Sequence, residues 1–368
     1  IIFKTIKLFI KKEKTIRYRV LYAAFCGNII LLPVIISLFI YYTHEDKGRP
    51  ANIIVVQPNI DPYNEKFGGM TSEQQLAKLL NLAKQKTDKN TNLIIGPETA
   101  IPEGVWENDL YDSRSVDSLK NYLKKYPQLN ILMGLSSYKM YLKGEQISLT
   151  ARLYADQGWY DAYNSAMMID TSKKIQIYHK SRLVPGVEKM PYPKIFKSLE
   201  KFALDLGGTS GSLGIQDERS VLYSNDSVIK LAPVICYESI YGEFVSEYIQ
   251  NGANIICIIT NDGWWKDTPG YKQHCRYASL RAIETRKCIA RSANTGTSCF
   301  INQRGDIMQA TSWETDDVIK QTVLLNDEKT FYSKYGDYIA KAAIFMSVLI
   351  FIYIFFISIS RRFRIKAE

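Results

Sequence analysis

Histidine is scarce in this sequence. The three histidines, His44, His179 and His274, are too scattered along the chain to form a zinc site. The sequence also lacks a glycine-rich loop of the kind that binds phosphate groups, so it gives no sign of a nucleotide. We therefore expect neither a metal ion nor a cofactor.

The six cysteines are too irregularly spaced to predict a disulfide framework. Cys26 lies in an apolar segment, and Cys236 is a candidate nucleophile. Cys257, Cys288 and Cys299 are interpreted as packing residues. We predict no obligatory disulfide, although the charge pattern described below places the domain outside the cytoplasm.

The middle of the chain carries almost no net charge. The formal net charge of the sequence is +10, but residues 1–19 contribute +6 and residues 361–368 contribute +3. A protein that binds nucleic acid needs a basic face to neutralise phosphates. We therefore expect no nucleic-acid partner.

Two long segments lack charged residues altogether. They are residues 20–42, with 23 residues, and residues 342–360, with 19. A helix needs about 20 apolar residues to cross the hydrocarbon core of a bilayer. The first segment is too long for the apolar part of a signal peptide, and no small-residue cleavage site follows it before Thr43. Both segments are therefore predicted to be transmembrane helices.

The charge pattern also predicts how the chain crosses the membrane. Lysine and arginine cluster before the first span and after the second, and the positive-inside rule places such clusters in the cytoplasm. The predicted order is a basic cytoplasmic segment, a transmembrane helix, an extracytoplasmic catalytic domain, a transmembrane helix and a basic tail, at residues 1–19, 20–42, 43–336, 337–360 and 361–368. The first residue is Ile1 rather than Met, so we expect an earlier helix to be missing.

Within the tethered domain, apolar runs alternate with helical patterns, which predicts a layered α/β fold. The strands are predicted at residues 52–57, 92–96, 130–135, 165–170, 228–236, 254–260, 289–294 and 298–302. The helices are predicted at residues 71–85, 115–125, 240–250 and 270–287. No repeat or proline-rich linker divides this region. Two loops, residues 64–71 and 206–214, are long enough to act as lids.

Three chemically complementary residues end three of the apolar or alternating runs. Cys236 closes one run and is followed by a predicted helix, whose N-terminus would favour the thiolate. Glu98 could take the thiol proton, and Lys180 could stabilise an oxyanion. Spacing alone cannot show that these residues meet. A structural ion pair and a packing cysteine are the alternative interpretation.

Four short motifs, in chain order, carry a family resemblance. They are Gly96-Pro97-Glu98-Thr99-Ala100, Tyr178-His179-Lys180 with Leu183-Val184-Pro185 and Glu188, Cys236-Tyr237-Glu238, and Thr260-Asn261-Asp262-Gly263-Trp264-Trp265. Over most of residues 51–310 the chain resembles the nitrilase or carbon–nitrogen hydrolase superfamily. The flanking membrane helices and the Leu-Val-Pro and Cys-Tyr-Glu motifs resemble, more narrowly, the apolipoprotein N-acyltransferase family.

This resemblance implies an αββα sandwich with Glu98 as general base, Lys180 as oxyanion stabiliser and Cys236 as nucleophile. It implies transfer of an acyl chain, through a cysteine thioester, from a membrane phospholipid to a lipoprotein. The implied donor is phosphatidylethanolamine, and the acceptor is the α-amino group of the diacylglyceryl-cysteine that begins the apolipoprotein. The implied location is the bacterial inner membrane, with the catalytic domain on the periplasmic side.

The same matching implies roles for further residues. Glu188 would support Lys180, while Tyr237 and Glu238 flank the nucleophile, and the Tyr237 N–H is a candidate oxyanion donor. Three aromatic residues are candidates for substrate contact: Phe67, Trp264 and Trp265. The sequence departs from the family where Pro185-Gly186-Val187-Glu188 replaces the common Pro-Phe-Gly-Glu.

Two other functions stay open on the sequence. One is a membrane-anchored amidase or nitrilase that hydrolyses a small carbon–nitrogen substrate with the same triad. The other is a non-catalytic scaffold of the envelope that keeps the nitrilase fold. The three catalytic residue types argue against the scaffold, and the membrane helices argue against the hydrolase.

Overall fold

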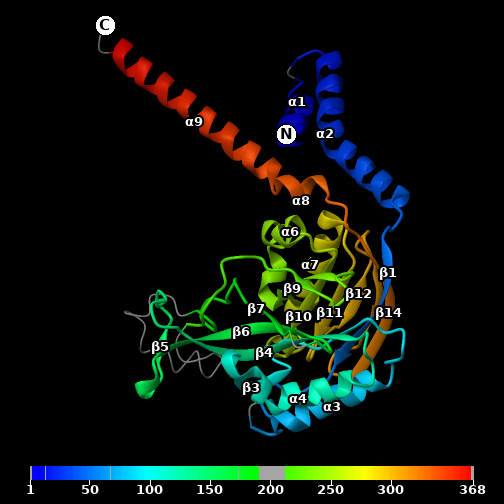
Figure 1. The fold of residues 1–368 in the computed structure, drawn as a ribbon. Helices are drawn as coiled ribbons and strands as arrows, with labels where there is room; N and C mark the ends of the chain where they lie inside the picture. The colour runs from blue at the N-terminus through cyan, green and yellow to red at the C-terminus, as the bar shows by residue number, and fades with distance from the viewer. Residues whose placement is uncertain (1, 13, 67, 173, 190–211, 366–368) are drawn as a thin grey trace. The chain divides into compact units, whose positions relative to one another are not determined.

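The structure is a computed structural model that describes the chain except residues 1, 13, 67, 173, 190–211 and 366–368 (Figure 1). The chain divides into two compact units, residues 1–46 and residues 47–368. The first unit consists of helices α1 (Ile2–Ile10) and α2 (Ile16–Thr43). The second unit contains two β-sheets and the helices that cover them. Most of the loop predicted at residues 206–214 lies outside the described residues.

Two helices are long and apolar enough to cross a membrane. They are α2 and the first part of α9 (Tyr338–Ile365), over residues 16–43 and 338–358. Each extends beyond its uncharged run because the flanking polar residues continue the helix. The Thr15 hydroxyl caps the start of α2 by accepting a bond from the Tyr18 N–H. Both helices suit the bilayer-spanning role predicted from the sequence.

The first sheet has eight strands. Its main order is β14-β1-β2-β4-β6-β5, and β3 and β7 pair with β4 and β6. Strands β1, β2 and β4 are parallel, whereas β6 is antiparallel to β4 and to β7. The strand bounds are β1 (Arg49–Gln57), β2 (Leu93–Ile95), β3 (Ile101–Trp106), β4 (Asn130–Met140), β5 (Arg152–Leu153), β6 (Trp159–Ile169), β7 (Gln176–His179) and β14 (Asp317–Leu325).

The second sheet has six strands in the order β13-β12-β11-β10-β9-β8. Its centre is parallel, because β10 runs with both β9 and β11. The bounds are β8 (Leu222–Tyr223), β9 (Lys230–Ile235), β10 (Ile255–Thr260), β11 (Ile289–Ala293), β12 (Cys299–Ile301) and β13 (Ile307–Ala310). Every residue of β10 is buried, as expected of a central strand with both faces covered.

The two sheets pack face to face between two pairs of helices. One apolar core joins the inner faces of both sheets, and it continues to α6 (Gly242–Gln250) and α7 (Pro269–Thr285). A second core lies between the first sheet and α3 (Ser72–Lys84) and α4 (Arg114–Leu123). Figure 1 shows α3 and α4 beside β4, and α6 and α7 beside β9 to β11. The predicted αββα sandwich is confirmed.

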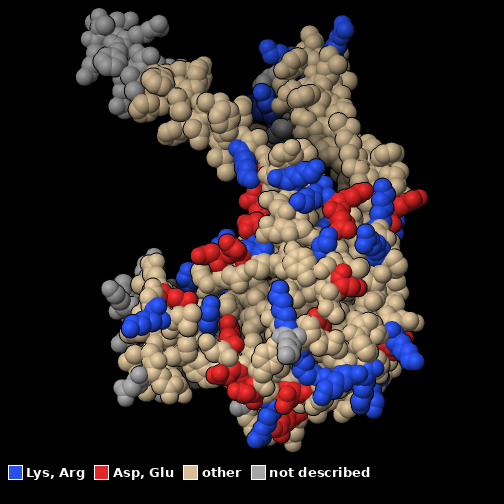
Figure 2. All heavy atoms as spheres, in the orientation of Figure 1, with Lys and Arg blue, Asp and Glu red and all other residues tan. Residues whose placement is uncertain are grey.

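The surface of this unit is electrostatically mixed. On the face drawn in Figure 2, basic and acidic side chains are interspersed over the sandwich. This distribution agrees with the small net charge between the two basic ends of the sequence. At the start of α9, the Lys341 ammonium lies 2.6 Å from the Glu243 carboxylate in the first turn of α6.

Several predicted elements differ from the structure in their bounds. The helix predicted at residues 240–250 is α6, which begins at Gly242, and a short 3-10 helix that was not predicted, Cys236–Ile240, precedes it. The Glu238 side chain binds the Ile235 N–H, and the Ser239 hydroxyl binds the Cys236 carbonyl, which competes with regular helical hydrogen bonds. Strand β6 begins six residues before the predicted strand 165–170.

Gly134 of β4 leaves space for the close approach of the turn that follows β2. A Cβ at this position would lie 2.7 Å from the Glu98 Cα and 2.5 Å from the Thr99 nitrogen. Both are backbone atoms and cannot rotate away. The missing side chain therefore allows the Glu98 turn to lie against the neighbouring strand.

We expect Gly134→Ala to lower the free energy of unfolding by about 1–3 kcal/mol, because overpacking forces the backbone to shift. The measurement is thermal unfolding of the full chain in detergent. Gly68→Ala is the matched control, since a Cβ there meets nothing within 4 Å. Equal unfolding midpoints for the two variants would contradict the close approach.

Candidate active site

A cavity of about 620 Å³ brings the three predicted catalytic residues together. Lys180 and Cys236 come directly after β7 and β9, and Glu98 comes three residues after the end of β2. Strands β2 and β7 belong to the first sheet and β9 to the second, so the cavity lies where strand ends from both sheets meet. Glu188, Tyr237, Trp264 and Trp265 also line it.

Lys180 lies between two carboxylates. Its ammonium is 3.0 Å from Glu98 Oε1 and 2.8 Å from Glu188 Oε1, and its side chain is only 1% exposed. The second oxygen of Glu188 accepts a 2.8 Å bond from the Val184 N–H. A buried ammonium is tolerated where opposite charges and hydrogen bonds compensate for lost hydration. The prediction that Glu188 supports Lys180 is thus consistent with the geometry.

Asn164 on β6 completes this cluster and was not anticipated from the sequence. Its amide nitrogen donates to Glu98 Oε1 at 2.8 Å and to Glu188 Oε1 at 2.9 Å. The other oxygen of Glu98 accepts a 3.1 Å bond from the Asn261 N–H, which follows β10 in the second sheet. Three donors, on Lys180, Asn164 and Asn261, therefore fix the Glu98 carboxylate. A lone asparagine inside a strand pattern carries no signal that could have identified it.

The pKa values of the pair follow from this arrangement. Burial opposes ionisation of Glu98, but the Lys180 ammonium and the Asn164 amide outweigh it and hold the pKa of the carboxyl below its usual range. Burial likewise opposes the charge of Lys180, yet Glu188 and Glu98 raise its pKa well above the ordinary value. Both groups are therefore charged at neutral pH.

Cys236 has an unusual backbone conformation. Its φ is +48°, in the left-handed region that non-glycine residues rarely adopt. Strained conformations of this kind are concentrated at functional sites, where surrounding contacts hold them. Here the Cys236 carbonyl accepts a bond from Ser239 at 2.8 Å and lies 3.1 Å from His274 Nε2. Those contacts fix the residue at the turn between β9 and the 3-10 helix.

The Cys236 thiol is protonated at neutral pH, contrary to the thiolate expected from the sequence. Burial, together with the Glu98 carboxylate, raises the pKa of the thiol to about 12, and Lys180 offsets only part of this. The predicted stabilisation by a helix N-terminus does not apply, because α6 begins six residues later. Activation of this cysteine therefore requires a base that removes the proton during attack.

Glu238 connects the nucleophile to the segment that carries Lys180. Its Oε1 accepts bonds from the Tyr178 hydroxyl and from the Ser181 and Arg182 N–H groups, at 2.8, 2.6 and 3.2 Å. Its Oε2 accepts the Ile235 N–H at 2.9 Å. The side chain is fully buried. Glu238 thus ties the end of β7 in one sheet to the end of β9 in the other.

The remaining predicted residues lie around the opening. Tyr237 is in the first turn of the 3-10 helix, where main-chain N–H groups have no helical acceptor, and its ring packs edge-on against Tyr241. The Trp264 ring packs against Tyr63, and Trp265 is 42% exposed beside His274. Phe67 lies outside the described residues.

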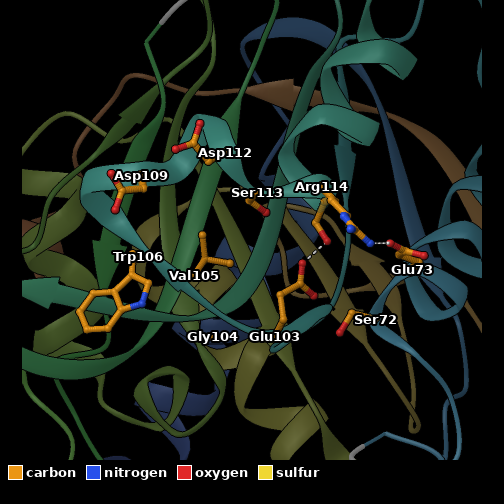
Figure 3. A pocket seen from close by; sticks show the side chains of 11 residues that line it. Ser72, Glu73, Glu103, Gly104, Val105, Trp106, Asp109, Asp112, Ser113 and Arg114 are labelled. Atoms are coloured by element: carbon orange, nitrogen blue, oxygen red, sulfur yellow. Dashed lines mark hydrogen bonds and ion pairs between the residues drawn. The ribbon is translucent and has the colours of Figure 1, made fainter. Parts of the chain in front are cut away.

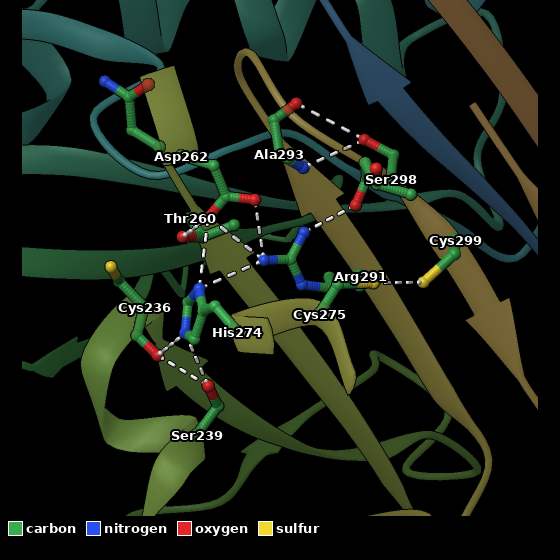
Figure 4. A network of polar contacts seen from close by, with 12 residues as sticks. Cys236, Ser239, Thr260, Asp262, His274, Cys275, Arg291, Ala293, Ser298 and Cys299 are labelled. Atoms are coloured by element: carbon green, nitrogen blue, oxygen red, sulfur yellow. Dashed lines mark hydrogen bonds and ion pairs between the residues drawn. The ribbon is translucent and has the colours of Figure 1, made fainter. Parts of the chain in front are cut away.

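A buried charge network supports Cys236 from behind (Figure 4). His274 Nδ1 lies 3.1 Å from Asp262 Oδ1, and Arg291 binds both oxygens of Asp262 at 3.1 and 2.8 Å. Burial raises the pKa of Asp262, but Arg291 and His274 outweigh it and hold the pKa below its usual range. The network ends at the Cys236 carbonyl and therefore fixes the position of Cys236.

Another pocket, between the start of α3 and the β3–α4 segment, is lined by other residues (Figure 3). There Glu103 accepts a bond from Ser115, and Glu73 pairs with Arg114 at 3.1 Å across exposed surface. These acidic groups are engaged in local contacts. The pocket shares none of its lining with the cavity around Cys236.

The sequence profile of the carbon-nitrogen hydrolase family matches residues 53–331, which include the whole cavity lining. The chain belongs to this family. The family assignment predicted from the four motifs is confirmed, and so is the narrower resemblance by the curated relatives. These are named apolipoprotein N-acyltransferase.

Two of these relatives show how similar the sequences are and how much of each chain aligns. The protein of Chlorobaculum tepidum is 32% identical over 330 residues, which cover 84% of this chain and 60% of the relative. Apolipoprotein N-acyltransferase 1 of Treponema denticola is 28% identical over 307 residues, which cover 79% of this chain and 54% of the relative. This carbon-nitrogen hydrolase family member thus spans about 60% or less of the length of these relatives.

Solved structures agree on the fold. A mutant amidase of Nesterenkonia AN1, from the nitrilase superfamily, aligns with a TM-score of 0.51 and 13% identity, covering 81% of this chain and 98% of that one. A Saccharomyces cerevisiae member of branch 10 of the nitrilase superfamily aligns with a TM-score of 0.52 and 14% identity, covering 76% and 92%. The nitrilase-like sandwich is therefore shared with these solved members of the nitrilase superfamily.

Reactivity of Cys236 should report its raised pKa. The other five cysteines are buried, so mild alkylation by iodoacetamide should modify Cys236 first. Because the thiolate is the minor form below a pKa of about 12, we expect the rate to rise about tenfold per unit between pH 6 and 8. Peptide mass spectrometry measures the rate. A plateau near pH 6 would mean that the thiolate already predominates.

Glu238→Gln should weaken the fold as well as the site. The new amide group would face main-chain N–H donors and leave at least one of them without an acceptor. We expect the free energy of unfolding to fall by about 2 kcal/mol. Thermal unfolding in detergent checks this, with Glu247→Gln as the control because Glu247 forms only a partly exposed pair with Arg219. Equal unfolding midpoints for Glu238→Gln and Glu247→Gln would show that Glu238 does not connect the two sheets.

Proposed function

We propose that this chain is the catalytic part of an N-acyltransferase that forms a thioester on Cys236. It would take an acyl chain from a membrane phospholipid and pass it to the α-amino group of a diacylglyceryl-cysteine at the start of an apolipoprotein. The main observation in support of this proposal is a single cavity in which a half-buried cysteine with a strained backbone lies beside the Glu98–Lys180 pair. The names of the curated relatives support this choice among carbon–nitrogen hydrolase activities.

In the first half-reaction, the Cys236 thiol loses its proton to the Glu98 carboxylate as sulfur attacks the ester carbonyl carbon. The ionised state of Glu98 makes it able to accept that proton. Lys180 and the Tyr237 N–H are proposed to stabilise the oxyanion that forms. Collapse of this intermediate breaks the carbon–oxygen bond. The leaving alkoxide takes the proton from Glu98 and departs as a lysophospholipid.

In the second half-reaction, the amine of the acceptor attacks the thioester carbonyl. Its proton passes to Glu98, the carbon–sulfur bond breaks and the proton returns to the sulfur. The product is an amide, and the thiol and carboxylate are restored. A thioester survives until the amine arrives only if water is kept away, which suits a site where Glu98 and Lys180 are 6% and 1% exposed.

Part of the cavity lining forms an apolar wall. Ala162 and Leu213 form a small buried cluster with Leu183, and Val184, Val187 and Tyr138 extend the lining. We assign this wall to the first carbons of the acyl chain, because burial of methylene groups is favourable by about 0.8 kcal/mol each. Trp264 and Trp265 stand beside the nucleophile and would contact either lipid.

The two apolar helices support a membrane setting for this chemistry. We propose that α2 and α9 span the bacterial inner membrane with their basic ends in the cytoplasm, which places the sandwich on the periplasmic side. Both lipid substrates would then lie in the adjoining leaflet. Phosphatidylethanolamine is the donor we propose to use first, because the sequence resemblance implies it.

Incubation of the detergent-solubilised chain with phosphatidylethanolamine should add one acyl mass to Cys236. Intact-protein mass spectrometry should detect the adduct, and hydroxylamine should remove it. Cys236→Ala should show none, and Glu98→Gln should slow its formation by about 100- to 10,000-fold, the usual contribution of a general base.

The acceptor is tested separately. A synthetic diacylglyceryl-cysteine peptide should discharge the adduct and gain the acyl mass. If the folded parent forms no adduct yet releases ammonia from a soluble amide, the chain is an amidase and not an acyltransferase. If it does neither, the proposal fails and the non-catalytic scaffold is favoured.

A further inference from the structure

A second lysine is buried in the lining of the cavity that holds Cys236. Lys66 lines the same cavity as Cys236 and Glu98, and only 4% of it is exposed. Its ammonium donates a 3.2 Å bond to the main-chain carbonyl of Glu98. The Lys66 ammonium thus binds the main chain of Glu98, whereas the Lys180 ammonium binds the Glu98 carboxylate.

The backbone around Lys66 is fixed by contacts that do not involve its charge. The Lys66 N–H donates to the Asp61 carbonyl at 2.9 Å, and the Lys66 carbonyl accepts a 2.7 Å bond from the buried Gln75 side chain. The Glu65 carboxylate accepts the Asp61 N–H at 3.0 Å. These main-chain contacts should therefore hold the side chain at position 66 in the cavity even when the ammonium is replaced by another group.

Burial of this ammonium is costly. Lysine usually keeps its charged end in water while its stem packs against apolar surface. Burial lowers the pKa of Lys66 to about 8, and interactions with Glu98 and Cys236 offset part of that decrease. Packing of this loop alone would not require a charged side chain at position 66. Buried groups with shifted pKa values next to reacting groups are candidates for a functional role.

The charge changes of the proposed reaction show what this ammonium could do. Lys180 already bridges two carboxylates, Glu98 and Glu188. When Glu98 takes the thiol proton, one of those carboxylates becomes neutral and a negative charge appears on the Cys236 sulfur. The Lys66 ammonium also helps to hold the pKa of the Glu98 carboxyl down, but that attraction is lost once Glu98 is protonated, whereas the attraction to the negative sulfur remains.

We propose that the Lys66 ammonium stabilises the Cys236 thiolate as the thiol proton moves to Glu98. Lys66 keeps its own proton throughout, so the step needs no further reactant. The inference rests on the proposed function, in which Cys236 is the nucleophile and Glu98 the base.

The test compares two substitutions at this position in the full detergent-solubilised chain. Lys66→Gln keeps a donor for the Glu98 carbonyl but removes the charge, whereas Lys66→Arg keeps the charge. The readout is the rate of Cys236 alkylation by iodoacetamide from pH 6 to 10, followed by peptide mass spectrometry. Lys78→Gln is the control, because Lys78 pairs with Asp316 outside the cavity.

At pH 7 we expect Lys66→Gln to lower the alkylation rate at least about tenfold, which corresponds to one unit of thiol pKa. Lys66→Arg and Lys78→Gln should stay within about threefold of the parent, less than half a unit. A parent-like rate for Lys66→Gln would overturn the proposal. So would an equal loss in Lys66→Gln and Lys66→Arg, since geometry rather than charge would then be responsible.

The parent chain provides a test that does not depend on folding of a variant. Loss of the Lys66 proton near pH 8 should flatten the rise of the alkylation rate above that pH. A tenfold rise per unit that continues to pH 10 would contradict the inference. Alkylation uses no lipid, so this result is independent of acyl-thioester formation. A parent that forms the thioester while Lys66→Gln reacts normally would refute only the role of Lys66.

Discussion

The buried ion pair network around Lys180 is the constraint on which the site depends. Two carboxylates and an ammonium are held away from water, and each is tolerated only because the others are present. Asn164 contributes to both carboxylates and fixes their orientation. The same bonds keep Glu98 ionised beside a thiol that is protonated. The resting site therefore holds an ionised carboxylate and a protonated thiol in one cavity.

The sheets explain why this arrangement forms. Glu98, Lys180 and Cys236 all follow strands, and the register of those strands brings their ends to one cavity. Gly134 lets the Glu98 turn approach, and the left-handed φ of Cys236 turns the chain sharply after β9. Chemistry here depends on backbone geometry as much as on the reacting side chains.

Local sequence patterns predicted the parts that depend on local interactions. The Ile- and Val-rich runs predicted the central strands, and the motifs at their ends predicted the triad, whose catalytic roles stay a prediction. Asn164 and Lys66 were not found, because their importance arises from pairing and packing between distant segments. Strand β14, which pairs with β1, was missed for the same reason. The thiolate expectation was wrong because burial and the Glu98 carboxylate raise the pKa of the Cys236 thiol to about 12.

The seam of the sandwich passes through this site. Glu98 belongs to the first sheet and holds the Asn261 N–H of the second, while Glu238 belongs to the second and holds the Ser181 N–H of the first. In many enzymes the reactive groups strain the fold, and stability rises when they are replaced. Here the hydrogen bonds of Glu98 and Glu238 in the candidate site also join the two sheets. Loss of either carboxylate would therefore disturb the fold together with the site.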